Sequence, residues 1–270
     1  MGPLEPAVTL VGRSGQARRL AGPGALRQQS QMAWAERARR RIKAGRKAGA
    51  LWVRILDVLR LVPTAEGRAR LWTRVVHWND VHQTTPFTAE ERYPELFDLA
   101  ARLAPDAERI LSFGCSTGEE LLSIRRRFPN ARIIGAEINP RSRHIAARRV
   151  RNDSGTNVVP PKWMEGSFDL IFALAVFQRE PHKIDETGAQ EISSHYPFER
   201  FDTGVADLVR RLRAHGLLCV TNAQYRIEDS SAAISLEAIG DAPRTDATLF
   251  GRDGRKLEDA VASSMFRNRA

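Results

Sequence analysis

The stretch "RILSFGCSTGEELLSIRRRFP", Arg109 to Pro129, carries most of the information about the fold. It begins with a short apolar run typical of a buried strand, passes through the glycine-bearing turn Gly114–Gly118, and ends in a run with helical periodicity. Glycine permits positive φ and close approach to the backbone, and the N-terminus of a helix presents unpaired N–H groups. The stretch therefore predicts a strand, a ligand-binding loop and a helix, in that order.

Apolar runs and amphipathic segments alternate downstream of this stretch. We expect strands at 131–138, 157–159, 168–177 and 217–222, and helices at 119–128, 140–150 and 202–216, the last closed by Gly216. Continuous apolar strands that alternate with helices favour an α/β fold with a parallel, doubly wound sheet. In the tail, the pair Asp253-Gly254 predicts a hairpin, and we expect a short terminal helix after it.

The chain before this sheet divides by composition. We expect residues 1–30, rich in glycine, proline and arginine, to form a disordered basic leader, and residues 31–104 a helical N-terminal extension. In the extension, Thr88 and Glu91 have the spacing of a capping box, which predicts a helix that Pro105 ends. Residues 105–270 form the predicted main domain, with an insertion at 179–201.

The net charge of +10 comes from the N-terminal part of the chain, since residues 1–62 hold 13 Lys and Arg against 3 Asp and Glu. Its last part is an apolar helical segment with a narrow polar stripe. It could anchor the protein to a membrane surface, RNA or a partner, or pack on the main domain with its arginines in solvent. The two cysteines are far apart and have no metal-binding spacing. With no spanning apolar run and no secretory signal, we expect a cytoplasmic protein and no metal site.

The loop after the first strand lies where doubly wound sheets bind ligands. Its G-x-x-x-G spacing lacks the residues of phosphate-binding and dinucleotide-binding loops. Glu119 and Glu120 directly after it would repel a pyrophosphate and suit a ligand that carries positive charge. Glu137, 19 residues after Gly118, is placed to accept hydrogen bonds from ribose hydroxyls. A ribose and a cationic group without phosphate describe S-adenosyl-L-methionine.

These segments together resemble the core of the class I S-adenosylmethionine-dependent methyltransferases, whose fold is Rossmann-like. "ILSFGCSTGEE" is similar to the first motif, "IIGAEINP" to the acidic second motif, and "GSFDLIFALAVFQ" to the strand and loop that face the methyl group. The loop is most similar to that of the chemotaxis-receptor methyltransferases, although Ala173–Val176 departs from their pattern. The resemblance implies the following cofactor-binding residues: Phe113, Gly114, Cys115, Ser116, Thr117, Gly118, Glu119, Glu137, Ile138, Asn139 and Ala173.

The resemblance implies methyl transfer to a small-molecule or protein carboxyl, hydroxyl or amine acceptor, with no catalytic residue assigned. We expect Gln178, Arg179 and His182 to contact the substrate, because they directly follow the fourth strand or begin the insertion. Three pairs or single residues are alternatives of lower rank: His195 and Tyr196 as base or orienting groups, Tyr225 and Arg226 as the far wall of the pocket, and Glu165 as the adenine-side acid. Cys219 is predicted to lie in the core.

Two other classes of function remain open from the sequence. The first is a non-catalytic Rossmann-like protein with a regulatory or scaffolding role. The second is a methyltransferase that associates with RNA or a membrane through the basic segment 31–62. Loss of salt-dependent binding after deletion of residues 1–62 would favour the second class.

Overall fold

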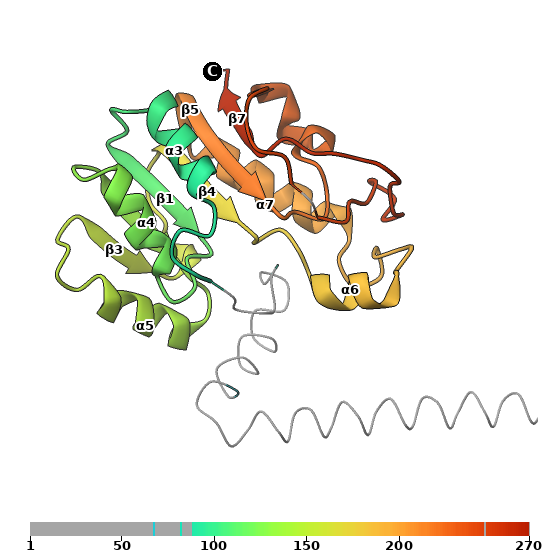
Figure 1. Ribbon diagram of the computed structural model, residues 1–270, viewed down its shortest axis with the longest axis horizontal. Helices are drawn as coiled ribbons and strands as arrows, with labels where there is room; N and C mark the ends of the chain where they lie inside the picture. The colour runs from blue at the N-terminus through green and yellow to red at the C-terminus, as the bar shows by residue number, and fades with distance from the viewer. Residues whose placement is uncertain (1–66, 68–81, 83–87, 246, 270) are drawn as a thin grey trace, which may run out of the picture. The chain divides into compact units, whose positions relative to one another are not determined.

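The computed structural model describes residues 67, 82, 88–245 and 247–269 (Figure 1). These residues belong to one unit of the chain, which begins at Arg60. The predicted disordered leader, the basic amphipathic segment and most of the helical extension lie outside the described residues.

A seven-stranded sheet organises the described part of the chain, in the order β3-β2-β1-β4-β5-β7-β6. Its strands are β1 (Arg109–Phe113), β2 (Arg132–Ala136), β3 (Thr156–Val159), β4 (Phe168–Leu174), β5 (Leu212–Thr221), β6 (Leu236–Ala238) and β7 (Met265–Asn268). The first five strands are parallel, and β7 lies antiparallel between β5 and β6. The predicted doubly wound α/β sheet is confirmed, with an antiparallel strand added. The strand order reverses beside β1, so the crevice between β1 and β4 is the expected ligand site.

The helices cover the two faces of the sheet unequally. They are α3 (Pro94–Leu103), α4 (Glu119–Arg127), α5 (Pro140–Arg149), α6 (Pro181–Thr187) and α7 (Phe198–Arg210). In Figure 1, α3, α4 and α5 lie on the face toward the viewer and α7 lies behind the sheet. Ile110 and Leu111 in β1 are both fully buried, and each packs into the core on a different face because successive strand residues point to opposite sides.

The start of α3 differs from the capping-box prediction, which is wrong. The helix begins at Pro94, and Tyr93 before it makes no side-chain capping bond. Glu91 has a positive φ of 52°, and its backbone N–H donates to Ser123 Oγ at 3.0 Å. Proline at the first helical position has its φ already set for a helix and needs no N–H partner, so it sets the start without a capping box.

Two predicted elements at the C-terminal side are also wrong. The helix expected at 202–216 ends at Arg210, and the residues up to Gly216 belong to β5. There the register shifts from the pair Phe168–Leu212 to the pair Leu170–Leu217, so extra residues of β5 form an irregularity that bends the strand. The expected terminal helix is replaced by β7.

The tail turn at Asp253-Gly254 is confirmed. Phe250 and Lys256 form an antiparallel bridge across it, and Gly254 has a φ of 78°. The tail also contacts the insertion, because Lys256 N–H donates to Gln190 O at 2.9 Å. The insertion is therefore tied to the tail and contains α6 as well as the start of α7. Within the described residues, no helix has the length and apolar character that crossing a membrane requires.

Candidate functional site

The loop between β1 and α4 is held against the end of β2. The backbone N–H groups of Gly114 and Cys115 both donate to Ala136 O, at 2.8 and 3.2 Å. Gly114, Ser116 and Gly118 have positive φ values of 80°, 50° and 91°. Because the loop turns through left-handed conformations three times, its backbone is exposed to the crevice beside the strand ends, as the sequence predicts.

Close packing explains why two of these positions are glycine. A Cβ at Gly114 would lie 2.5 Å from Val176 Cγ2, and a Cβ at Gly118 would lie 3.0 Å from the backbone Cα of Ala146 in α5. Gly114 thus lets the segment after β4 approach the loop. Gly118 lets α5 approach the start of α4.

Glu137 directly follows β2, and its carboxylate binds the loop. Its Oε2 accepts from the Ser116 N–H at 2.9 Å, and its Oε1 accepts from the Asn139 N–H at 2.6 Å. The side chain is 8% exposed. Burial raises the pKa of Glu137, while the hydrogen bonds from Asn139 and Ser116 oppose the rise. The carboxylate predicted to bind ribose therefore lies beside the loop and is fixed in place.

Ser116 contributes a polar atom that the protein itself does not satisfy. Its Oγ is buried, and among the described residues it is the one buried side-chain polar atom without a hydrogen-bond partner. Buried polar groups in folded proteins are nearly always paired with protein, water or ligand. The unpaired hydroxyl lies in the same loop that Glu137 binds, so the loop is suited to a ligand with polar groups.

The two glutamates that follow the loop have different partners. Glu119 Oε1 pairs with Arg149 Nη2 at 2.6 Å, and Glu119 Oε2 accepts from Thr117 Oγ1 at 2.7 Å. Glu120 Oε1 accepts from Ser112 Oγ at 2.7 Å, and Ser112 is fully buried in β1. Burial raises the pKa of Glu120 to about 7. Glu119 thus ties the loop to α5, whereas Glu120 lies against the end of β1.

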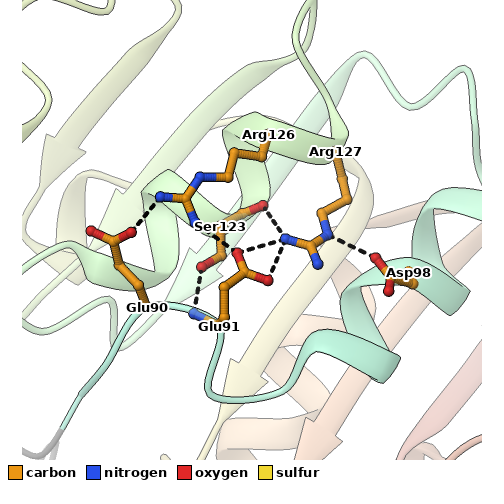
Figure 2. Close-up of polar contacts among 6 residues, drawn as sticks. All are labelled: Glu90, Glu91, Asp98, Ser123, Arg126 and Arg127. Atoms are coloured by element: carbon orange, nitrogen blue, oxygen red, sulfur yellow. Dashed lines mark hydrogen bonds and ion pairs between the residues drawn. The ribbon is translucent and has the colours of Figure 1, made fainter.

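A network of charged side chains holds the segment before α3 on α4, as Figure 2 shows. Arg127 Nη1 binds Glu91 at 2.6 Å, and Arg127 Nε binds Asp98 at 2.9 Å. Arg126 adds a 2.9 Å bond to Glu91 and a second bond to Glu90. The network fixes a segment that sequence reasoning had assigned to a helix.

The same segment also reaches the end of β5. Tyr93 OH accepts from Asn222 Nδ2 at 2.7 Å, and Asn222 directly follows the strand. Tyr93 and Arg92 act electrostatically with Glu120: Arg92 lowers the pKa of Glu120, and Glu120 raises the pKa of Tyr93. The segment therefore brings a cation and a phenol to the carboxyl end of the sheet beside Glu120.

Of the predicted substrate residues, Gln178 and Arg179 lie in the turn after β4 and His182 lies elsewhere. Gln178 and Arg179 are 5% and 4% exposed. The Gln224 side chain accepts from Arg179 N–H at 2.8 Å and donates to Arg179 O at 3.0 Å. This pair of bonds joins the turn after β4 to the segment after β5. His182 is exposed in the first turn of α6.

Sequence reasoning missed His82, which lies at the end of β4. Its Nδ1 is 2.9 Å from Tyr196 OH, and its ring meets Phe177 edge-on at 5.0 Å between centroids. Burial, assisted by Arg200 and Arg179, lowers the pKa of His82 to about 3, so the imidazole is neutral. No sequence signal could have linked residues 114 positions apart.

The lower-ranked candidates are mostly buried or distant. Tyr196 and Tyr225 are fully buried, and Tyr225 OH donates to Tyr196 O at 2.5 Å, so both pack in an aromatic cluster. Arg226 pairs with Asp229 at 2.7 Å. His195 is half-buried, and burial lowers its pKa. The exposed Glu165 lies near the start of β1, because its carbonyl accepts from Arg109 Nη2 at 3.2 Å. Glu165 is thus at the edge of the sheet opposite the loop.

The remaining predicted cofactor residues surround the ends of β1, β2 and β4. Phe113 is half-buried and stacks with Phe177 at 6.2 Å between centroids, Ile138 is half-buried, and Ala173 is buried in β4. Asn139 caps α5, since its Oδ1 accepts from the backbone of Arg141 at 2.9 Å. Cys115 and Cys219 are both buried, and burial raises the pKa of each thiol.

Comparison with known proteins gives one domain match. Residues 88–187 match the family model described as a methyltransferase domain. No curated protein sequence matches the chain. Among solved structures, the N-methyltransferase NodS from Bradyrhizobium japonicum WM9 in complex with S-adenosyl-L-homocysteine is similar at 16% identity and a TM-score of 0.41, over 67% of this chain and 89% of that one.

Two further solved structures are similar at comparable levels. TehB from Haemophilus influenzae shows 11% identity and a TM-score of 0.42, over 64% of this chain and 61% of that one. The amino pentose methyltransferase CalS10 from Micromonospora echinaspora shows 21% identity and a TM-score of 0.33, over 49% of each chain. The chain spans about half the length of CalS10 and 41% of the StiE O-MT fragment. The segment 88–187, which holds the loop after β1, the acidic residue after β2 and the end of β4, is similar to a methyltransferase domain.

Proposed function

We propose that the chain is an S-adenosyl-L-methionine-dependent methyltransferase that acts on a small-molecule or protein carboxyl, hydroxyl or amine. The observation that carries the proposal is the Glu137 carboxylate, which is buried at the end of β2 and bonded to the Ser116 N–H of the loop. The match of residues 88–187 to a methyltransferase domain supports it.

The residues around the loop fit this cofactor. Two lone pairs of the Glu137 carboxylate accept from Ser116 and Asn139, and those that remain can accept from ribose hydroxyls. The unpaired Ser116 Oγ offers a further polar contact. The loop residues 114–118 contain no Lys or Arg, which agrees with a cofactor that has no phosphate. When bound, the cofactor supplies a methyl group activated by its sulfonium.

The chain's own residues contribute position and dryness at the point of transfer. Val176 packs on Gly114, and Phe177 stacks on Phe113, so the segment after β4 lies directly against the loop. His82 and Tyr196 cover Phe177 from the other side and are themselves buried. Holding two reactants in line and excluding water lowers the barrier of a displacement without a dedicated catalytic group.

Calorimetric titration with S-adenosylmethionine and S-adenosylhomocysteine tests the proposal. We expect wild type to bind both, and Glu137→Gln, which preserves size, to bind about 10- to 100-fold more weakly because charge-assisted bonds to the ribose are lost. Glu165→Gln at the opposite edge is the matched control and should bind as wild type does. A folded wild-type protein that binds neither ligand refutes the proposal and favours the non-catalytic Rossmann-like alternative.

The basic segment 31–62 stays a predicted contact for RNA or a membrane surface. Its support is the excess of Lys and Arg in residues 1–62. Comparing the full chain with a chain lacking residues 1–62 in salt-dependent binding to RNA and to anionic vesicles tests it.

A further inference from the structure

Glu120 is an acidic side chain at the proposed cofactor site that the proposed function leaves without a role. It is the second residue of α4 and lies directly after the loop. Its Oε1 accepts from Ser112 Oγ at 2.7 Å, and Ser112 is the next-to-last residue of β1. Among the described residues, no other group bonds to this carboxylate. Its second oxygen is therefore available to a ligand at the carboxyl end of β1.

The neighbouring Glu119 is already engaged at both of its oxygens. One oxygen pairs with Arg149 in α5 and the other accepts from Thr117. Arg149 is anchored in turn, because its Nε donates to Thr117 O at 2.8 Å. Recruiting Glu119 to a ligand would break an ion pair that holds the loop on α5. Recruiting Glu120 breaks nothing.

Four titratable groups face Glu120 from the elements packed around it. They are Arg92 and Tyr93 at the start of α3, Cys115 in the loop and Cys219 in β5. Burial raises the pKa of the phenol and of both thiols, so these three stay neutral near neutral pH. Arg92 is then the one charged group of the four, and it stands ahead of α3 rather than on α4.

We propose that Glu120, and not Glu119, binds the ammonium group of the cofactor's amino-acid moiety and releases a proton to solvent as the cofactor binds. The inference rests on the proposed function for the identity of the cofactor. An ammonium has three N–H donors and needs an acceptor, which Glu120 offers with its second oxygen. A sulfonium has no donor and would make no use of that oxygen as a hydrogen-bond acceptor.

The ionisation of Glu120 makes this contact dependent on pH. Burial raises the pKa of Glu120 to about 7, so near neutral pH about half of the free molecules carry a neutral Glu120. A cationic ligand selects the ionised form. Affinity for such a ligand should therefore rise about tenfold from about pH 6 to about pH 8, as the proton no longer has to be displaced.

Titration calorimetry with two probes tests the proposal. S-adenosylhomocysteine carries the ammonium, and 5′-methylthioadenosine lacks the whole amino-acid moiety. We expect Glu120→Gln, which keeps the acceptor for Ser112, to bind S-adenosylhomocysteine about 10- to 100-fold more weakly and methylthioadenosine as wild type does. The pH dependence for S-adenosylhomocysteine should vanish in the variant. Glu95→Gln removes the same charge from an exposed position in the first turn of α3 and should change neither affinity.

Four outcomes would overturn the proposal. Equal weakening of both probes would show that Glu120 only supports the loop. Weakening of S-adenosylhomocysteine alone in Glu119→Gln would assign the contact to Glu119. A larger loss for S-adenosylmethionine than for S-adenosylhomocysteine would point to the sulfonium. Unchanged affinity in Glu120→Gln, with normal wild-type binding, refutes this inference and leaves the proposed function intact, whereas absence of wild-type binding refutes both.

Discussion

The buried histidine at the end of β4 leads to a quantitative prediction about stability. His82 is 8% exposed, shares a 2.9 Å hydrogen bond with Tyr196 OH, and lies edge-on against Phe177. Burial lowers its pKa from 6.5 to about 3, assisted by the positive charges of Arg200 and Arg179. Protonating this ring in the folded state is unfavourable, so acid should loosen the contact between residue 82 and the end of β4.

The sign and size of the effect follow from the two pKa values. Because the folded pKa is depressed, the unfolded chain takes up the proton first. His82 therefore contributes its full stability above pH 6.5 and loses it as the pH falls from 6.5 toward 3. At about pH 5, the free energy of unfolding should be lower by about 2 kcal/mol than at about pH 7.5, from this group alone.

Glu120 acts in the opposite direction and would partly hide the effect in wild type. Its folded pKa is raised to about 7, so its contribution is fully present below its unfolded value of 4.5 and is lost as the pH rises through 7. Comparing wild type with His82→Asn at each pH removes this contribution, because Glu120 is present in both proteins. Asparagine can keep a polar atom near the position of Nδ1 while removing the ionisable ring.

Urea unfolding at several pH values measures the difference. We expect wild type to be more stable than His82→Asn at about pH 7.5, and this advantage to shrink by about 2 kcal/mol at about pH 5. His182→Asn, on the exposed face of α6, should show no such change in its difference from wild type. An advantage that stays constant across this pH range would refute the reasoning, since it would mean that His82 is not held neutral in the folded state.

Two further predictions concern the contacts that hold the loop and its surroundings. Arg127→Met should lower the free energy of unfolding by about 1–2 kcal/mol, because that guanidinium is 17% exposed and binds two carboxylates, whereas Arg126→Met, at a side chain 51% exposed, should have no measurable effect in thermal unfolding. Gly118→Ala should destabilise by about 2–4 kcal/mol, from the left-handed backbone and the 3.0 Å approach to Ala146 Cα. Gly188→Ala, with similar φ sign and open space, should lose only about 1–2 kcal/mol in urea unfolding, and equal losses would contradict the packing argument.

The parts of the fold that the sequence predicts well are those set by local patterns. The strands at Arg109–Phe113 and Thr156–Val159 and the helix at Pro140–Arg149 agree closely with the apolar runs and with the proline that starts the helix. The errors fall where long-range pairing decides. Residues up to Gly216 pair with β4 although Gly216 reads locally as a helix end, and β7 fills the space between β5 and β6 although the tail reads locally as helical.

The candidate site divides in the same way. The loop and Glu137 follow from spacing within one βαβ unit, because the carboxyl ends of adjacent parallel strands meet at one edge of the sheet. His82 and Tyr196 could not be found in this way, since their contact depends on how the segment before α3 and the insertion after β4 pack together. Local spacing identifies residues that one unit brings together, and it does not identify residues supplied by separate segments.

Glu119 and Glu120 are a different case, because the sequence does contain the distinction between them. Consecutive residues of a helix point about 100° apart, so two adjacent glutamates cannot serve the same surface. The apolar stripe of α4 includes Leu121 and Ile124, and Glu120 lies four residues before Ile124, on the side that faces the sheet. Nearness to the glycine loop favoured Glu119, whereas the helical period favours Glu120. The period is the stronger guide, because it determines which carboxylate reaches the end of β1 and which one faces α5.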